Sequence, residues 1–202
     1  MKLILASSSQ RRRELLTMCG YDYSIEVSLA DENTDEKDPS RYVSLLAERK
    51  AREVCARLGL RDTVVLGADT VVYYAGEIIG KPRDEADAKR ILTLLSGNTH
   101  TVYTGVAVVS ERSCKVRCDT TRVTFAELSE EEIDAYVASG EPMDKAGAYG
   151  IQGSFGMFVK EICGNYFTVI GLPLPTAYRM LKNAGVLPRD FEKIGGSAHN
   201  MQ

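Results

Sequence analysis

Segments with strand-like and helix-like patterns alternate along almost the whole chain, and this alternation limits the folds that it can adopt. The β-branched run at 63–74 is typical of a strand, whereas residues 39–58 and 83–95 carry apolar side chains three and four positions apart, as amphipathic helices do. No linker interrupts this alternation before residue 187. It therefore predicts one α/β domain.

Local start and stop signals place the other predicted elements. Ser129 and Glu132 form a capping box for a short helix that ends at Gly140, and Asp38-Pro39 supplies an N-cap followed by proline. The sequence Gly67–Thr70 is expected to break the run 63–74. We further expect strands at 2–6, 77–80, 100–109 and 115–125, an extended segment at 22–29, helices at 12–19 and 175–184, and a hairpin of 157–163 with 166–170 around Gly164-Asn165.

Two segments have neither a helix-like nor a strand-like pattern. Residues 141–156 are predicted to form a loop rich in functional side chains, in which Gly147, Gly150, Gly153 and Gly156 recur every third residue. Residues 188–202 are predicted to form a disordered tail.

Composition excludes several classes of function. The 25 Lys and Arg against 28 Asp and Glu leave a net charge of -3, which argues against a general nucleic-acid surface. Apolar runs such as 106–109 are far shorter than the roughly 18 residues of a membrane helix, and 3–6 is too short for a signal peptide. The five cysteines are irregularly spaced, which favours free thiols. We expect a cytoplasmic protein without nucleic-acid or membrane partners.

The turn after the first strand is the first candidate site. Ser7, Ser9, Arg11 and Arg12 lie between a strand and a helix, where backbone amides, serine hydroxyls and guanidinium groups suit phosphate oxygens. The alternative is a serine N-cap followed by solvated arginines. The chain contains neither GxxxxGK[ST] nor GxGxxG, so an ordinary P-loop or Rossmann site is not supported.

Three charged residues stand out from their surroundings. Lys50 lies on the apolar stripe of its helix, where it either reaches solvent or pairs with an anion. Asp69 lies inside an apolar strand run, where it either caps backbone amides or holds Mg²⁺ or a water molecule. Glu32, in an acidic loop, either joins Asp69 as a metal ligand or is simply solvated.

Lys81 stands directly before Pro82, which restricts its backbone, although an exposed lysine is the ordinary alternative. A hydrolase with a catalytic histidine would have to use His100, and no GxSxG elbow accompanies it. Together, the carboxylates, lysines, arginines and phosphate-type turn describe metal-assisted attack on a polyphosphate.

Five motifs resemble, in order and spacing, those of the Maf nucleoside triphosphate pyrophosphatases. The resemblance runs from about residue 2 to residue 187, and its last motif is highly specific. We take residues 1–187 as one domain. The motifs are Ala6–Arg12, Leu66–Val72, Gly80–Pro82, Ser96–His100 and Glu141–Gly153.

This resemblance implies an α/β fold akin to the inosine triphosphate pyrophosphatases, with a mixed central sheet flanked by helices and a cleft along the sheet. It implies a homodimer that hydrolyses dTTP and UTP, or modified pyrimidine nucleotides, to the monophosphate and pyrophosphate. A divalent cation, Mg²⁺ or Mn²⁺, is the implied cofactor, and the implied role is cleansing of the nucleotide pool.

The resemblance also implies roles for individual residues. Asp69 matches the family's proton acceptor, and Glu32, Lys50 and Lys81 match charged residues of its catalytic cleft. We expect Asp69 and Glu32 to hold the metal, and Lys50, Lys81 and Arg12 to offset charge on the departing pyrophosphate.

Arg11, Thr70 and Gln152 match the positions associated with base selection in the dTTP/UTP branch. The Gln152 amide offers both a donor and an acceptor to the edge of uracil or thymine. The sequence departs from the family's motif at Gln10, where the family usually has proline. Glutamine leaves the backbone angle φ of this turn less restricted than proline would. Two alternatives stay open: a 7-methyl-GTP pyrophosphatase, disfavoured by Thr70 and Gln152, and a nucleotide-binding inhibitor of septum formation.

Overall fold

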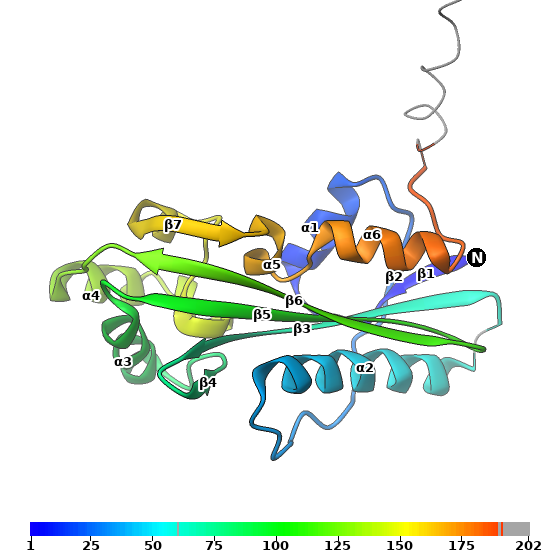
Figure 1. Ribbon diagram of the computed structural model, residues 1–202, viewed down its shortest axis with the longest axis horizontal. Helices are drawn as coiled ribbons and strands as arrows, with labels where there is room; N and C mark the ends of the chain where they lie inside the picture. Colours follow the sequence, from blue (N-terminus) through cyan, green and yellow to red (C-terminus); the bar gives the residue numbers. More distant parts are fainter. Residues whose placement is uncertain (60, 190, 192–202) are drawn as a thin grey trace, which may run out of the picture.

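In the computed structural model, which describes residues 1–59, 61–189 and 191, helices pack on both faces of one long twisted sheet (Figure 1). Within this described part, seven strands form the mixed sheet. The strands are β1 (Lys2–Leu5), β2 (Ser24–Ile25), β3 (Thr63–Tyr74), β4 (Glu77–Ile79), β5 (Thr99–Ser110), β6 (Cys114–Phe125) and β7 (Val159–Gly164). The predicted α/β domain with a mixed central sheet is confirmed.

The strand order β2-β1-β3-β5-β6-β7 leaves a gap beside β3. β5 pairs antiparallel with β3 from Val64 to Tyr73 and so occupies one whole edge of it. On the other edge, β1 pairs in parallel with β3 at 63–66, and β4 pairs with it at 72–74. The stretch between these two partners, which contains Asp69 and Thr70, therefore lies open where β1 ends.

The helices cover the two faces of the sheet unequally. They are α1 (Gln10–Met18), α2 (Pro39–Leu58), α3 (Glu85–Leu95), α4 (Glu130–Ala138), α5 (Tyr166–Ile170) and α6 (Leu174–Asn183). α2 alone runs along one face, α1 and α6 lie on the opposite face, and α3 and α4 pack at the far end of the long strands (Figure 1).

Alternation along β3 sends neighbouring side chains to these opposite faces. Val65 belongs to the core under α2, whereas Val64, Leu66 and Ala68 belong to the core with α1 and α6. By the same alternation, Asp69 points to the α2 face and Thr70 to the α1 face. Asp69 and Thr70, which are neighbours in the sequence, thus lie on opposite faces of the sheet.

Gly67 does not break β3, contrary to our expectation, because β3 runs without interruption to Tyr74. Its role is close packing: a Cβ atom on Gly67 would lie 2.3 Å from the carbonyl oxygen of Ala47 in α2. Gly105 lies opposite Asp69 in β5, and a Cβ atom on Gly105 would lie 2.2 Å from the carbonyl oxygen of Val43 in α2. These two glycines let α2 lie directly against the sheet beside Asp69.

The predicted hairpin of 157–163 with 166–170 is wrong in its second half. Residues 166–170 form α5, because the Asn165 side chain caps the helix by accepting a hydrogen bond from the Phe167 amide at 2.9 Å. This cap outweighs the strand preference of the aromatic and β-branched residues that follow. The extended segment expected at 22–29 is a strand only at Ser24–Ile25.

α1 begins at Gln10 and not at Arg12, because the Ser7 hydroxyl accepts from the Ser9 amide at 3.1 Å and turns the chain early. Of the predicted tail, residues 190 and 192–202 lie outside the described residues. Arg189 pairs with Asp22. All five cysteines are free, and no helix among the described residues is long and apolar enough to cross a membrane.

The segment 141–158, hereafter the glycine-rich segment, connects α4 to β7. It contains short 3₁₀ helices at Glu141–Asp144, Ala146–Ala148 and Ser154–Phe158. Its Tyr149 and Phe155 pack with Phe125 and His100 in a cluster of aromatic rings at the far end of the sheet. This packing brings the segment back toward β3.

Candidate functional site

A cavity of about 350 Å³ opens at the gap beside β3. We call it the charged cavity. The turn into α1, the loop before α2, the middle of β3 and the Lys81 turn all contribute to it. Of the residues singled out in the sequence, it is lined by Ser7, Ser9, Arg11, Arg12, Glu32, Lys50, Asp69, Thr70 and Lys81.

The N-terminus of α1 faces this cavity with free donors. Ser9 occupies the N-cap position, but its side chain makes no capping hydrogen bond within the described part of the chain. The first-turn amides of a helix lack internal partners and carry the positive end of the dipole. This turn is therefore suited to an anion.

Arg12 lies half-buried behind the same turn. Its Nε donates to the Gly171 carbonyl at 2.8 Å, and its terminal nitrogens donate to Ser7 Oγ and Thr70 Oγ1, each at 3.2 Å. Burial lowers the pKa of Arg12, and the neighbouring Asp69 acts in the opposite direction. A guanidinium stays charged in proteins, so Arg12 brings a fixed positive charge to the cavity and has further N–H groups for an anion.

Lys50 joins two carboxylates at the centre of the cavity. Its Nζ lies 2.7 Å from Asp69 Oδ1 and 2.9 Å from Glu32 Oε2. The Lys50 and Asp69 side chains are 13% and 12% exposed, whereas Glu32 is 59% exposed. Of the two alternatives for Lys50 on an apolar helix face, the structure therefore shows pairing with an anion.

Burial raises the pKa of Asp69 above its ordinary range. The positive charges of Lys50 and Arg12 lower it, and the negative charge of Glu32 raises it further. A carboxylate with a raised pKa is a stronger base than an exposed one, which suits a proton acceptor.

The donor set fits a divalent cation that arrives with a polyphosphate. Mg²⁺ usually binds one or two protein carboxylates and takes its other ligands from water and substrate phosphates. Glu32 and Asp69 converge on the same point, since both contact the Lys50 ammonium. No group of three or more His, Cys, Asp or Glu side chains among the described residues can hold a metal on its own.

A second, smaller cavity of about 40 Å³ adjoins the first and is lined by Gln152. We call it the narrow cavity. Arg11 and Thr70 line both cavities, and the narrow one adds apolar walls from Val72 and Ile151. The three residues linked to base selection are thus brought together in a cavity that Lys50 and Glu32 do not line.

Thr70 is held by a chain of hydroxyl groups. Its Oγ1 lies 3.0 Å from Thr104 Oγ1, and Thr104 donates to the carbonyl of Thr168 at 2.8 Å. Thr70 also accepts from Arg12. Its side chain therefore has a defined orientation between the two cavities.

Asp144 and Lys145 belong to the site, although their roles were not assigned from the sequence. Asp144 lines the charged cavity, and its Oδ2 accepts from Arg11 Nη1 at 2.9 Å. Lys145 lines the narrow cavity and contacts Asp144 Oδ1 at 2.8 Å. Burial raises the pKa of Asp144, but Lys145 and Arg11 outweigh this and hold it below the usual range. The available signal was their place in the Glu141–Gly153 motif.

His100 lies outside both cavities, as expected from the weak case for a histidine hydrolase. Its Nε2 lies 3.0 Å from the Tyr149 hydroxyl. Burial lowers the pKa of His100 to about 4. It is therefore a neutral core residue at pH 7.

Comparison with known proteins gives one family and many relatives. The model of the family described as Maf-like protein matches residues 2–184. Proteins named dTTP/UTP pyrophosphatase from Bacillus cereus (strain AH820) and Bacillus anthracis are each 50% identical over 186 residues, which is 92% of this chain and 96% of each relative.

Two solved structures are similar to parts of this chain. The Ham1 protein of Staphylococcus aureus has a TM-score of 0.47 at 14% identity, over 63% of this chain and 73% of that one. A nucleoside-triphosphatase / dITP/XTP pyrophosphatase from Mycobacterium abscessus has a TM-score of 0.41 at 17% identity, over 70% of this chain and 96% of that one.

Proposed function

Because the chain belongs to the Maf-like protein family, we propose that it hydrolyses dTTP and UTP to the nucleoside monophosphate and pyrophosphate. The observation that carries this proposal is the pairing of a large charged cavity with a narrow one that contains Gln152. The names of its 50% identical relatives support the same substrates.

The charged cavity suits the triphosphate. The free amides at the start of α1 and the hydroxyls of Ser7 and Ser9 offer hydrogen bonds to phosphate oxygens. Lys50, Lys81 and Arg12 offset the charge that develops on the departing pyrophosphate. Lys81 is well placed for this role because the Gly80 carbonyl accepts from the Gly147 amide at 2.9 Å, which fixes its turn to the glycine-rich segment.

Asp69 accepts the proton of the water that attacks the α-phosphorus. Its buried carboxylate has a raised pKa and is oriented by the Lys50 ammonium at 2.7 Å. Attack forms the new P–O bond to the monophosphate as the bond to the bridging oxygen of pyrophosphate breaks. Lys50 and Arg12 supply positive charge beside the reacting phosphate.

Glu32 and Asp69 would hold the divalent cation, together with phosphate oxygens and water. When bound, such a cation neutralises phosphate charge in the transition state. Lys50 contacts both of these carboxylates, so it orients them toward the same point.

Gln152 reads the base. Its amide can donate to and accept from the edge of uracil or thymine, while Val72 and Ile151 supply apolar walls. The narrow cavity has room for about three water molecules as it stands. A pyrimidine therefore displaces the exposed Gln152 side chain on entry, and a purine would require a larger displacement.

The test is pyrophosphate release from dTTP, UTP, CTP, ATP, GTP and 7-methyl-GTP, with Mg²⁺, Mn²⁺ or a chelator. We expect dTTP and UTP to be the best substrates and the chelator to abolish turnover. In ¹⁸O-labelled water, attack at the α-phosphorus places the label in UMP, whereas label in pyrophosphate would show attack at the β-phosphorus and refute this mechanism. Tight nucleotide binding without turnover would instead support the septum-inhibitor alternative.

We also infer from the resemblance that the protein is a homodimer. Light scattering on the purified protein measures its mass directly. A mass equal to the 22.2 kDa chain across the micromolar range would contradict the dimer.

A further inference from the structure

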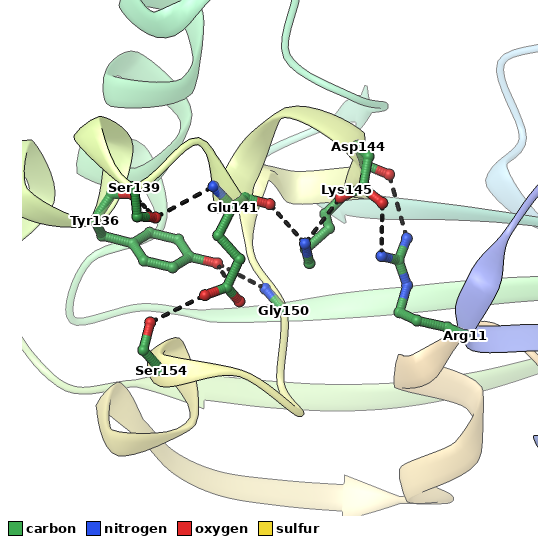
Figure 2. Close-up of polar contacts among 8 residues, drawn as sticks. All are labelled: Arg11, Tyr136, Ser139, Glu141, Asp144, Lys145, Gly150 and Ser154. Carbon is green, nitrogen blue, oxygen red and sulfur yellow. Dashed lines mark hydrogen bonds and ion pairs between the residues drawn. The ribbon is translucent and has the colours of Figure 1, made fainter. Parts of the chain in front are cut away.

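The Tyr136 hydroxyl joins the end of α4 to the loop that carries Gln152. It accepts from the Gly150 amide at 3.1 Å and donates to Glu141 Oε1 at 3.2 Å. The other carboxylate oxygen of Glu141 accepts from Ser154 Oγ at 3.0 Å (Figure 2). Gly150 and Ser154 flank Gln152, so one tyrosine–glutamate pair holds both sides of the base-reading residue.

Two glycines of the segment are required for this arrangement. A Cβ atom on Gly153 would lie 2.0 Å from Glu141 Oε1, and one on Gly150 would lie 2.5 Å from Lys145 Cε. The loop therefore closes around the Glu141 carboxylate and the Lys145 side chain. This explains two of the four glycines whose spacing of three residues had no assigned role.

The same network continues to Arg11. Lys145 Nζ donates to the Glu141 carbonyl at 2.6 Å and contacts Asp144 Oδ1 at 2.8 Å. Asp144 in turn accepts from Arg11 through both its carboxylate and its carbonyl (Figure 2). A continuous set of polar contacts thus links the two cavities.

The Tyr136 hydroxyl can be separated from the rest of its side chain. The ring belongs to the core and packs on Phe155 with 4.8 Å between ring centroids. The hydroxyl instead faces Glu141 and the Gly150 amide, which are not part of that core. Its removal therefore leaves the core contacts of the ring in place.

We propose that Tyr136 and Glu141 are positioning residues for base selection, which hold Gln152 in register with Arg11. They act through the loop and touch neither the base nor the phosphates. This inference rests on the proposed function, since base selection has meaning only for a nucleotide reaction.

Tyr136→Phe tests this role in the intact protein. We expect the KM for UTP to rise about three- to tenfold, the factor that one ordinary hydrogen bond is worth, with kcat little changed. Discrimination between UTP and purine triphosphates should fall by a similar factor. The matched control is Tyr21→Phe. Tyr21 is a buried tyrosine in the core with α1 and α6, and its hydroxyl has no hydrogen-bond partner in the described part of the chain. An unchanged KM and nucleotide preference in Tyr136→Phe would overturn the inference.

Amide hydrogen exchange tests the positioning without any activity. The Gly150 amide should exchange faster in Tyr136→Phe than in wild type or Tyr21→Phe, and unchanged exchange would overturn the inference. If wild type releases no pyrophosphate from dTTP or UTP, the proposed function fails and the base-selection role fails with it, whereas the exchange measurement still decides whether the Tyr136 hydroxyl holds the loop at Gly150. Ser154→Ala, an exposed change, gives a smaller shift in the same direction and serves if Tyr136→Phe does not fold.

Discussion

The charged cavity and the narrow cavity share Arg11 and Thr70 but are built in different ways. The charged cavity takes Lys50 from α2 and Asp69 from β3, which are regular elements anchored in the core. The narrow cavity takes Gln152 from a glycine-rich segment that has no strand or α-helix and is held by aromatic packing and side-chain hydrogen bonds. Changes in the first should therefore affect the rate of the reaction, and changes in the second should affect the choice of nucleotide.

The largest expected effect is on the charged side. Asp69→Asn keeps the size of the side chain and an oxygen for Lys50 but removes the base, so kcat for UTP should fall by about 10²- to 10⁴-fold. Steady-state pyrophosphate release measures it. Asp134→Asn, an exposed aspartate that pairs with Lys89 outside both cavities, is the control. Near-normal turnover by Asp69→Asn would contradict the assignment of the base.

On the narrow side, Gln152→Ala should flatten nucleotide preference more than it slows UTP hydrolysis. The loss of paired amide hydrogen bonds should reduce discrimination against purine triphosphates by about 5- to 100-fold. Relative kcat/KM values across the nucleotide panel check this. Gln152→Glu, which keeps the size and the acceptor but loses the donor, separates hydrogen bonding from shape. Equal relative rates in wild type and Gln152→Ala would remove Gln152 from base reading.

A smaller effect concerns the pH dependence of stability at the far end of the sheet. The pKa of His100 is about 4 in the folded chain against 6.5 in an unfolded one. Below pH 6.5 the unfolded chain binds a proton that the folded chain does not, so stability is lost as the pH falls toward 4. The slope from this group is about 1.4 kcal/mol per pH unit.

Urea unfolding at pH 7, 6 and 5 measures this slope. His100→Gln keeps a polar partner for Tyr149 but does not titrate, so its free energy of unfolding should depend less on pH. Parallel curves for the two proteins would show that His100 does not cause the loss.

The smallest expected effect is at the entrance to α1. Gln10 is the first residue of the helix, where proline is well tolerated, and the preceding Ser9 already has an extended backbone. Gln10→Pro should raise the free energy of unfolding by about 0.4–1 kcal/mol by restricting the unfolded chain. The control is Gln10→Ala, which also removes the hydrogen bond from the Gln10 side chain to Glu14 but does not restrict the backbone. A destabilised Gln10→Pro variant would show that the turn needs the freedom of glutamine.

Much of the fold could be predicted because its signals are local. The Ser129 capping box, the Asp38 N-cap and the alternating strands all form as their sequences indicate. α5 was missed because one asparagine side chain decides between helix and strand. Gly67 was misjudged because its packing partner, Ala47, lies on another element.

The candidate site divides in the same way. The structure places Lys50 and Asp69, which stand out from their apolar neighbours, in direct contact. The contacts of Asp144 and Glu141 could not be predicted, because they depend on how an irregular loop folds back on α4 and α1. Patterns of three to four residues carry no information on such contacts.

The close approach of α2 to the sheet has a consequence for how freely this protein tolerates mutation. The backbone of α2 lies so close to Gly67 and Gly105 that neither position has room for a Cβ atom. A library that exchanges core residues such as Val43 or Val54 for others of similar volume should therefore yield many active variants with altered melting temperatures. Any side chain at either glycine would move Lys50 away from Asp69, so these two positions should accept no substitution among the active clones.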